Sequence, residues 1–98
     1  MLEKLTSENF SPLLEQEFQI ELELNKTLLV RLIEVSINNQ SEQREGRQSF
    51  SIIFRGPRDF PFEQGTYQVS NETLGEVHIF LVPIGPDEKG MCMEAVFN

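Results

Sequence analysis

The side chains that could perform nucleophilic, acid–base or metal chemistry are few in this chain of 98 residues. His78 is the only histidine, and Cys92 is the only cysteine. One histidine cannot build a multi-histidine metal site, and the sequence suggests no Ser-His-Asp set. A buried lone cysteine behaves as a small apolar side chain. We therefore predict no catalytic residue, no metal site and no cofactor, and we expect that the protein is not an enzyme.

Acidic residues outnumber basic ones by 16 to 8, which gives a net charge of −8. Neighbouring carboxylates such as Asp59 with Glu63, or Asp87 with Glu88, are therefore expected from surface charge alone. Proteins that bind nucleic acid present a basic stripe, whereas the basic residues here are scattered. The longest apolar run, residues 79–82, is far too short for a membrane span, and no apolar segment of a signal peptide follows the first residues. We predict a cytoplasmic protein that binds neither nucleic acid nor membrane.

The residues best suited to recognition lie in one short segment, residues 54–62, which reads FRGPRDFPF. Arginine and aromatic side chains dominate binding energy at protein interfaces, so Arg55, Arg58, Phe60 and Phe62 are candidates for an interaction surface. The alternative is structural, with the two phenylalanines plugging one end of the fold and the two arginines pairing with nearby acids. We favour the structural interpretation.

The elements that would position these residues are predicted to be β-strands, because apolar and polar residues alternate along most of the chain. Residues 17–24 alternate without interruption, so one face of this strand is buried and the other is solvated. Residues 27–38 also alternate, but the apolar row shifts phase at Leu32 and Ile33, which predicts a β-bulge. Glycine and proline mark the ends of the later strands. These strands are residues 48–55, 66–70, 76–84 and 91–97.

Turns and one short helix complete the predicted elements. Residues 5–16 favour a helical segment with Thr6 or Ser7 as N-cap and an interruption at Pro12. Its apolar side covers an end or a face of the sheet and consists of Phe10, Leu13 and Leu14. The predicted connections are a tight turn at Asn25 and Lys26, a polar loop over residues 38–47, a segment rich in proline and phenylalanine over residues 58–64, and a hairpin loop over residues 85–90.

Six strands with short connections and no βαβ spacing predict an antiparallel, all-β fold. We expect residues 1–98 to form one domain, a six-stranded antiparallel barrel or a coiled β-sandwich with a short N-terminal helix. The inward positions of the strands predict the core. These residues are Phe18, Ile20, Leu22, Phe50, Ile52, Phe54, Val77, Ile79 and Leu81.

An excess of apolar residues falls on the outward positions of the same strands. A patch of this kind is larger than a soluble monomer usually exposes. We predict self-association as a two-fold homodimer, or contact with a different subunit, with Phe80 and Val82 at the contact and Arg55 or Arg58 on its rim. In a two-layer sandwich the same residues would instead belong to the core. The outward set is Leu29, Ile53, Phe80, Val82, Ile84 and Val96.

The chain resembles a bacterial family of small uncharacterised proteins, a domain of unknown function. The resemblance rests on the motifs FRGP (residues 54–57), QGTY (residues 64–67), FLVPIGP (residues 80–86) and EAVFN (residues 94–98), with a similar pattern around Phe10 and Phe18. It implies a compact β domain without transferable catalytic residues. It also implies an accessory role beside phage-tail-like components. An aromatic residue common in the family before Glu94 is replaced here by Met93.

Together these features favour a non-enzymatic interaction or structural-accessory protein, which could belong to a bacterial phage-tail-like assembly. The alternative is a small-ligand-binding β-barrel, which would need an internal pocket of a few hundred cubic ångströms. Eight phenylalanines in so small a domain argue against such a pocket.

Overall fold

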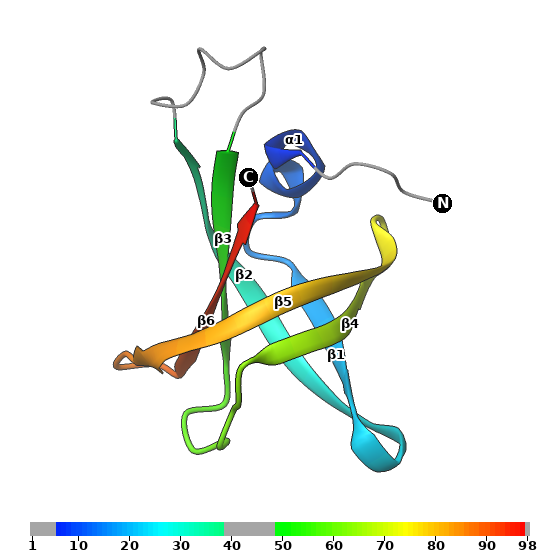
Figure 1. The fold of residues 1–98 in the computed structure, drawn as a ribbon, viewed down its shortest axis with the longest axis vertical. Helices are drawn as coiled ribbons and strands as arrows, with labels where there is room; N and C mark the ends of the chain where they lie inside the picture. The colour runs from blue at the N-terminus through cyan, green and yellow to red at the C-terminus, as the bar shows by residue number, and fades with distance from the viewer. Residues whose placement is uncertain (1–5, 39–48, 98) are drawn as a thin grey trace.

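The computed structural model describes residues 6–38 and 49–97, without the side chains of Leu24 and Asn38. Six strands close into a barrel in the order β1-β2-β3-β6-β5-β4, and all neighbouring pairs are antiparallel (Figure 1). The predicted all-β fold is confirmed, and its architecture is a barrel. The elements are α1 (Ser7–Phe10), the 3-10 turn η1 (Ser11–Leu13), β1 (Glu17–Leu22), the 3-10 turn η2 (Glu23–Asn25), β2 (Lys26–Asn38), β3 (Ser49–Gly56), β4 (Gly65–Asn71), β5 (Gly75–Pro86) and β6 (Met91–Phe97).

The predicted β-bulge in the second strand is confirmed. The register between β2 and β3 shifts between Leu32 and Glu34, so Ile33 is the extra residue. β2 pairs with β1 up to Arg31 and with β3 from Arg31 onward. The bulge therefore lies just after the point where β2 changes partner, and the bend that it introduces helps a single long strand to serve two sides of the barrel.

The predicted end of the first strand and the turn that follows it are wrong. β1 ends at Leu22, which pairs with Lys26, and η2 replaces both the last two strand residues and the tight turn expected at Asn25 and Lys26. Asn25 has a φ of 61°, a left-handed conformation that asparagine tolerates better than most residues. Alternation continues to Leu24 in the sequence, but a strand can extend only as far as its partner does.

The last hairpin also differs from the prediction, because β5 continues to Pro86 and the loop shrinks to residues 87–90. The register between β5 and β6 shifts between Pro83 and Gly85, which makes Ile84 a second bulge residue. Proline cannot donate to a β-ladder and is tolerated at bulges. Gly85 has a φ of 106°, which glycine adopts without steric cost. The other predicted loop, residues 38–47, lies outside the described residues, except that Asn38 ends β2.

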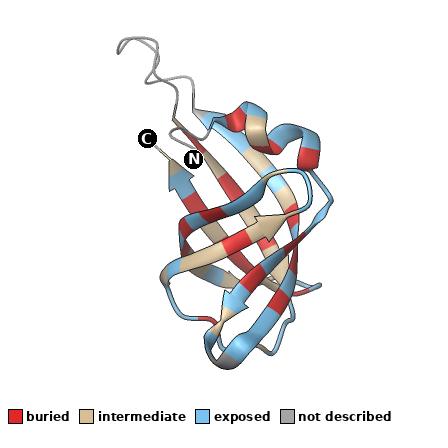
Figure 2. Ribbon diagram, turned by 90° about the vertical axis from the view of Figure 1, so that its right-hand side faces the viewer, coloured by how far each residue is buried: buried red, intermediate tan, exposed pale blue. Residues whose placement is uncertain are grey.

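The core lies inside the barrel, where buried residues alternate with exposed ones along the strands (Figure 2). Eight of the nine predicted core residues are buried, and Leu22 is half-buried because it ends its strand. Residues that contribute to the core beyond the predicted nine include Leu28, Val30, Leu32, Val69, Met93 and Ala95 from the strands, and Phe10, Leu13 and Phe62 from outside them.

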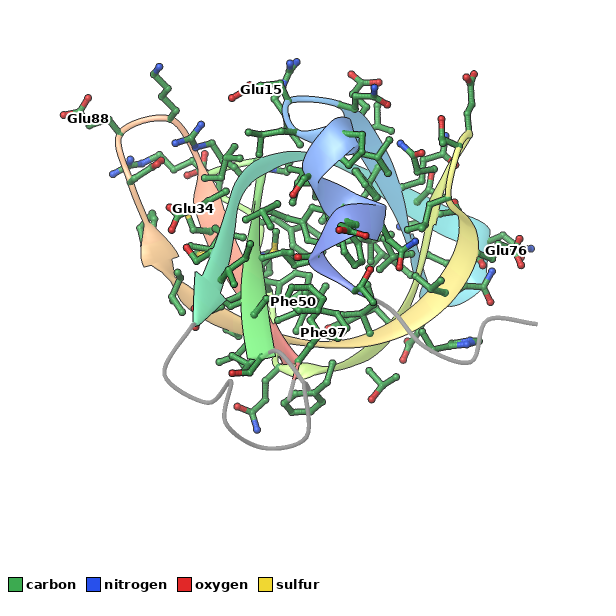
Figure 3. The ribbon with its side chains drawn as sticks, turned by 90° about the horizontal axis from the view of Figure 1, so that it is seen from above. Glu15, Glu34, Phe50, Glu76, Glu88 and Phe97 are labelled. Atoms are coloured by element: carbon green, nitrogen blue, oxygen red, sulfur yellow. The ribbon has the colours of Figure 1, made fainter. Side chains whose placement is uncertain are left out.

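The N-terminal helix closes one end of the barrel. The Thr6 N–H donates to Asn9 Oδ1 at 2.8 Å, which holds the first turn together. Phe10 is fully buried, with its ring centroid 6.0 Å from that of Phe50 and 5.7 Å from that of Phe97. Figure 3 looks down onto this end and shows Phe50 and Phe97 within the ring of strands.

The prediction that Leu14 lies on the apolar side of this helical segment is wrong. It was expected beside Phe10 and Leu13, yet it is exposed. The 3-10 turn ends at Leu13, and Leu14 has a ψ of 135°, so its side chain leaves the helical face. Among the described residues, no helix has the length and apolar composition needed to cross a membrane.

Candidate interaction surface

The segment between β3 and β4 lies at the end of the barrel opposite α1 (Figure 1). Phe62 is buried, with its ring centroid 4.8 Å from that of Tyr67, and the half-buried Phe60 ring lies 6.2 Å from Phe62. The Tyr67 hydroxyl donates to the Glu63 carbonyl at 2.6 Å and fastens the segment to β4. Both phenylalanines therefore pack as a plug, and Phe62 offers little surface to a partner.

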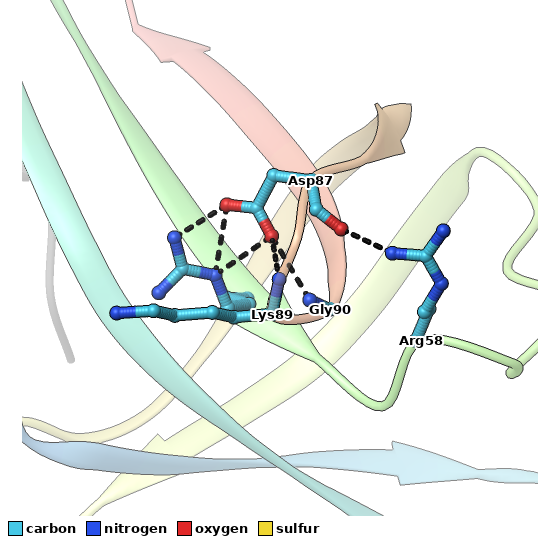
Figure 4. Close-up of polar contacts among 5 residues, drawn as sticks. Arg58, Asp87, Lys89 and Gly90 are labelled. Atoms are coloured by element: carbon cyan, nitrogen blue, oxygen red, sulfur yellow. Dashed lines mark hydrogen bonds and ion pairs between the residues drawn. The ribbon is translucent and has the colours of Figure 1, made fainter.

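Arg55 of β3 and Arg58 of the segment that follows β3 converge on Asp87, at the tip of the β5–β6 hairpin (Figure 4). Arg55 Nε lies 3.2 Å from Asp87 Oδ1 and 3.0 Å from Oδ2, and Arg55 Nη2 also donates to Oδ2. Arg58 Nη1 donates to the main-chain carbonyl of Asp87. The fork of a guanidinium matches a carboxylate in this geometry. The arginines thus fasten the β5–β6 hairpin to β3 and to the segment that follows it.

Asp87 also organises its own turn. Its Oδ1 accepts the N–H groups of Lys89 at 2.8 Å and Gly90 at 2.9 Å, and its own N–H donates to the Gly90 carbonyl at 2.7 Å. The Arg55 guanidinium, assisted by the Lys89 N–H, holds the pKa of the Asp87 carboxyl well below its usual range. The Arg55 pKa is raised in return by its hydrogen bond to Asp87.

Sequence reasoning dismissed Asp87 as surface charge and so missed the residue that joins the hairpin to the barrel. A usable signal was present in residues 85–90, GPDEKG. An aspartate that follows proline and precedes glycine by three residues is typical of a turn in which the side chain accepts main-chain N–H groups. That pattern predicts the turn, although it does not predict which arginine would pair with the carboxylate.

The remaining two candidate residues, Phe80 and Val82, lie on the outer face of β5. Phe80 is 53% exposed, while Val82 is half-buried. Val82 pairs with Glu94 of β6, which in turn pairs with Ile53 of β3, so these three side chains form one row across three strands. Phe80 and Val82 therefore stand on an outward surface, separate from the plug that contains Phe60 and Phe62.

The residues with possible chemical reactivity are not brought together. His78 is exposed on the outer side of β5, paired with Gln68. Cys92 is buried opposite Arg55, and burial, followed by the charge of Asp87, raises the pKa of its thiol. A raised pKa leaves little of the reactive thiolate at neutral pH. Across residues 6–38 and 49–97, no group of three or more His, Cys, Asp and Glu side chains is arranged to hold a metal ion.

Comparison with known proteins yields a family but no characterised relative. No curated protein and no solved structure matches the chain. A family model described as "Domain of unknown function (DUF6916)" matches residues 5–97, nearly the whole sequence. The chain belongs to this family, DUF6916.

Proposed function

We propose that this domain is a non-enzymatic protein-interaction module, a structural accessory of a larger assembly. A bacterial phage-tail-like particle is the kind of assembly that the family resemblance implies. The partner surface on this chain is the outer face of β5 with the adjoining parts of β6 and β3, which we call the β5–β6 face. It consists of Ile53, Phe80, Val82, Ile84 and Val96.

The observation that carries the proposal is the exposure of large apolar side chains on this face. Phe80 is 53% exposed, Ile84 50% and Val96 62%. Single exposed apolar residues are common on soluble proteins, but several on adjoining strands mark a contact surface. The arginines are held at the neighbouring hairpin by Asp87, so Arg55 and Arg58 border the face as a polar rim.

The filled barrel supports an interaction module over a small-ligand barrel. The largest fully buried side chains, including Phe10, Phe18 and Phe54, occupy the interior. Phe18 and Phe54 pack edge to face with ring centroids 4.9 Å apart. A ligand barrel of this strand number would need smaller inward residues to leave a cavity.

Pairwise binding measurements with the proteins encoded beside this gene test the proposal. We expect one of them to bind, and we expect Phe80→Glu to weaken that binding at least about tenfold, as burying an unpaired charge costs more than 1.4 kcal/mol. Leu29→Glu, an equally exposed leucine on the other side of the barrel, is the matched control and should leave this binding unchanged.

Two results would contradict the proposal. One is binding that Phe80→Glu does not change. The other is unfolding of Val82→Glu together with a strictly monomeric parent that binds none of these proteins, which would make the face part of the interior. Light scattering on the same variants also tests whether a second copy occupies this face, as the sequence predicts.

A further inference from the structure

We propose that a different surface, the outer side of β1 and β2, forms the contact of a two-fold symmetric homodimer. On this β1–β2 face a basic hollow and an acidic hollow lie side by side, and each would receive its opposite from the second copy. The inference does not depend on the proposed function, because Arg55 is the only residue shared with the rim of the β5–β6 face and none of the variants that test the inference changes it.

The basic hollow has a volume of about 350 Å³, and its lining includes three basic residues, Arg31, Arg55 and Lys89, and one acidic residue, Glu17. Three of the eight basic residues of the protein therefore gather around one depression. In a chain with a net charge of −8, such a concentration of cations is a local exception. It creates a site for carboxylates, since arginine and lysine donate charge-assisted hydrogen bonds to them.

Of the three cations of this hollow, both arginines have a carboxylate of the chain as a neighbour, whereas Lys89 forms no ion pair among the described residues. Arg31 and Arg55 are direct cross-strand partners, and like charges in that position destabilise a sheet. Arg55 forms an ion pair with Asp87, while Arg31 lies opposite Glu17 of β1 and donates to the main-chain carbonyl of Glu15 at 3.0 Å. An external carboxylate beside Lys89 would supply the ion pair that this cation lacks and would also reduce the repulsion between the two arginines.

The acidic hollow, of about 610 Å³, lies on the other side of the same face and is lined by Glu17, Glu72 and Glu76. Its walls are β1 and the β4–β5 hairpin, just as the β5–β6 hairpin borders the basic hollow. Figure 3 shows the two hairpins on opposite sides of the barrel, one marked by Glu76 and the other by Glu88, with Glu15 between them. The face thus carries both signs of charge at its two ends.

Leu29 lies between the hollows and lines both of them. It is 53% exposed and pairs with Gln19 of β1, so it is an apolar centre between two charged ends. A two-fold axis that lies in the contact plane and runs between the two ends of a surface brings each end onto the opposite end of the second copy. An axis near Leu29 would therefore place each basic hollow on an acidic hollow and leucine against leucine.

The opposite charges of the two hollows favour a second copy of the chain as the partner at the β1–β2 face. A strongly acidic partner would be attracted to the basic hollow but repelled by the acidic hollow, and a basic partner would meet the reverse. A second copy of the chain instead presents an acidic hollow to each basic hollow and a basic hollow to each acidic one. Because two copies with a net charge of −8 repel each other at long range, the contact must come from this local complementarity.

Light scattering and sedimentation of the full chain test the inference, with one charge reversal in each hollow. We expect a dimer at low salt that weakens as ionic strength rises from about 0.1 M to about 1 M, where the Debye length falls from about 10 Å to about 3 Å. Lys89→Glu and Glu76→Lys, both at exposed positions, should each weaken the dimer at least about tenfold, since the two-fold axis presents each change twice.

Mixing the two variants provides the decisive measurement. Lys89→Glu and Glu76→Lys should associate with each other more tightly than either variant associates with itself. In the mixed dimer one of the two contacts is native, and the other is reversed but still complementary. Leu29→Glu should abolish association in every mixture, and Phe80→Glu on the other face should leave it intact. Circular dichroism of each variant confirms that it is folded.

Three outcomes would overturn the inference. A parent that remains monomeric at every concentration and salt tested excludes the homodimer. A dimer that is lost in Phe80→Glu but not in Lys89→Glu lies on the β5–β6 face instead. Failure of the mixed variants to associate, while each remains folded, excludes the opposed arrangement of the two hollows.

Discussion

At the scale of single residues, Asp87 connects parts of the chain that are distant in sequence. Its carboxylate binds Arg55 of β3 and the N–H groups of its own turn, and its carbonyl binds Arg58. The sequence shows that such a turn is favourable, but the partners of a surface carboxylate depend on which strands become neighbours. The sequence predicts that the arginines pair with nearby acidic residues, but it does not identify Asp87 as the acid.

The pH dependence of stability provides a test of this carboxylate. Since the folded pKa of Asp87 is depressed, its contribution is complete well above about 3.9, the usual value for the unfolded chain, and is lost as the pH falls below that value toward the folded pKa. Asp87→Asn keeps an oxygen for the turn but loses the charge. We expect the parent to resist urea better than this variant at pH 6, with the difference shrinking below about pH 4.

The neighbouring acid supplies the control for that experiment. Glu88 is exposed in the same turn, so Glu88→Gln removes a charge without removing the contact to Arg55. Its urea midpoint should follow that of the parent through the same pH range. A constant difference between Asp87→Asn and the parent down to the lowest pH would show that the ion pair does not stabilise the fold.

Gly90 provides a second prediction at this scale, which concerns space rather than charge. A Cβ atom at Gly90 would lie 2.1 Å from the carbonyl oxygen of Gly56, a main-chain atom at the end of β3. We expect Gly90→Ala to destabilise the protein by at least about 2 kcal/mol in chemical denaturation, since the backbone must move. Gly65→Ala, whose Cβ would meet only the Tyr67 ring at 3.8 Å, should change stability by less than half as much. Equal stability of the two variants would contradict this account.

At the scale of elements, strands with regular alternation were predictable and their ends were not. The pattern of Phe50, Ile52 and Phe54 locates β3 within one residue, because a buried face imposes period two on the sequence. Even the bulge at Ile33 is visible as a change of phase. The end of β1 is invisible, because it depends on the length of its neighbours and on a left-handed residue at Asn25.

The α1 helix is too short to be stable alone, so its position must come from the barrel. Phe10 is the residue that attaches it, and its ring contacts Phe50 and Phe97. We expect Phe10→Ala to lower the free energy of unfolding by about 3–5 kcal/mol, the usual cost of deleting a buried ring. Leu14→Ala, four residues later and 43% exposed, should cost less than about 1 kcal/mol. If Phe10→Ala melts with the parent, the helix is not part of the cooperative unit.

At the scale of the whole molecule, the strands are joined unevenly. β3 pairs with both β2 and β6 along nearly its whole length, and β5 pairs with β4 along all of β4. β1 and β4 instead pair only at Gln19 with Ser70 and at Ile20 with Val69. The sequence does not display this difference, because the number of pairs between two strands depends on which strands become neighbours. Closure of the barrel therefore depends on its shortest seam, between β1 and β4.

Amide hydrogen exchange should reveal that seam. Local opening needs less free energy where fewer main-chain hydrogen bonds must break, so the amides that join β1 to β4 should exchange faster than those in the centre of β3. We expect the amides of Ile52 and Phe54 to exchange only through global unfolding, and those at the contact between Ile20 and Val69 to exchange through a smaller opening that is insensitive to low urea.

Uniform protection across all six strands would mean that the barrel opens as one unit and that the β1–β4 seam is no weaker than the others. Faster exchange at the seam would instead show that the barrel consists of two more stable groups of strands, β1-β2-β3-β6 and β4-β5. These are held at one side by the β1–β4 seam and at the other by the paired ends of β5 and β6, where Asp87 fastens the hairpin to β3.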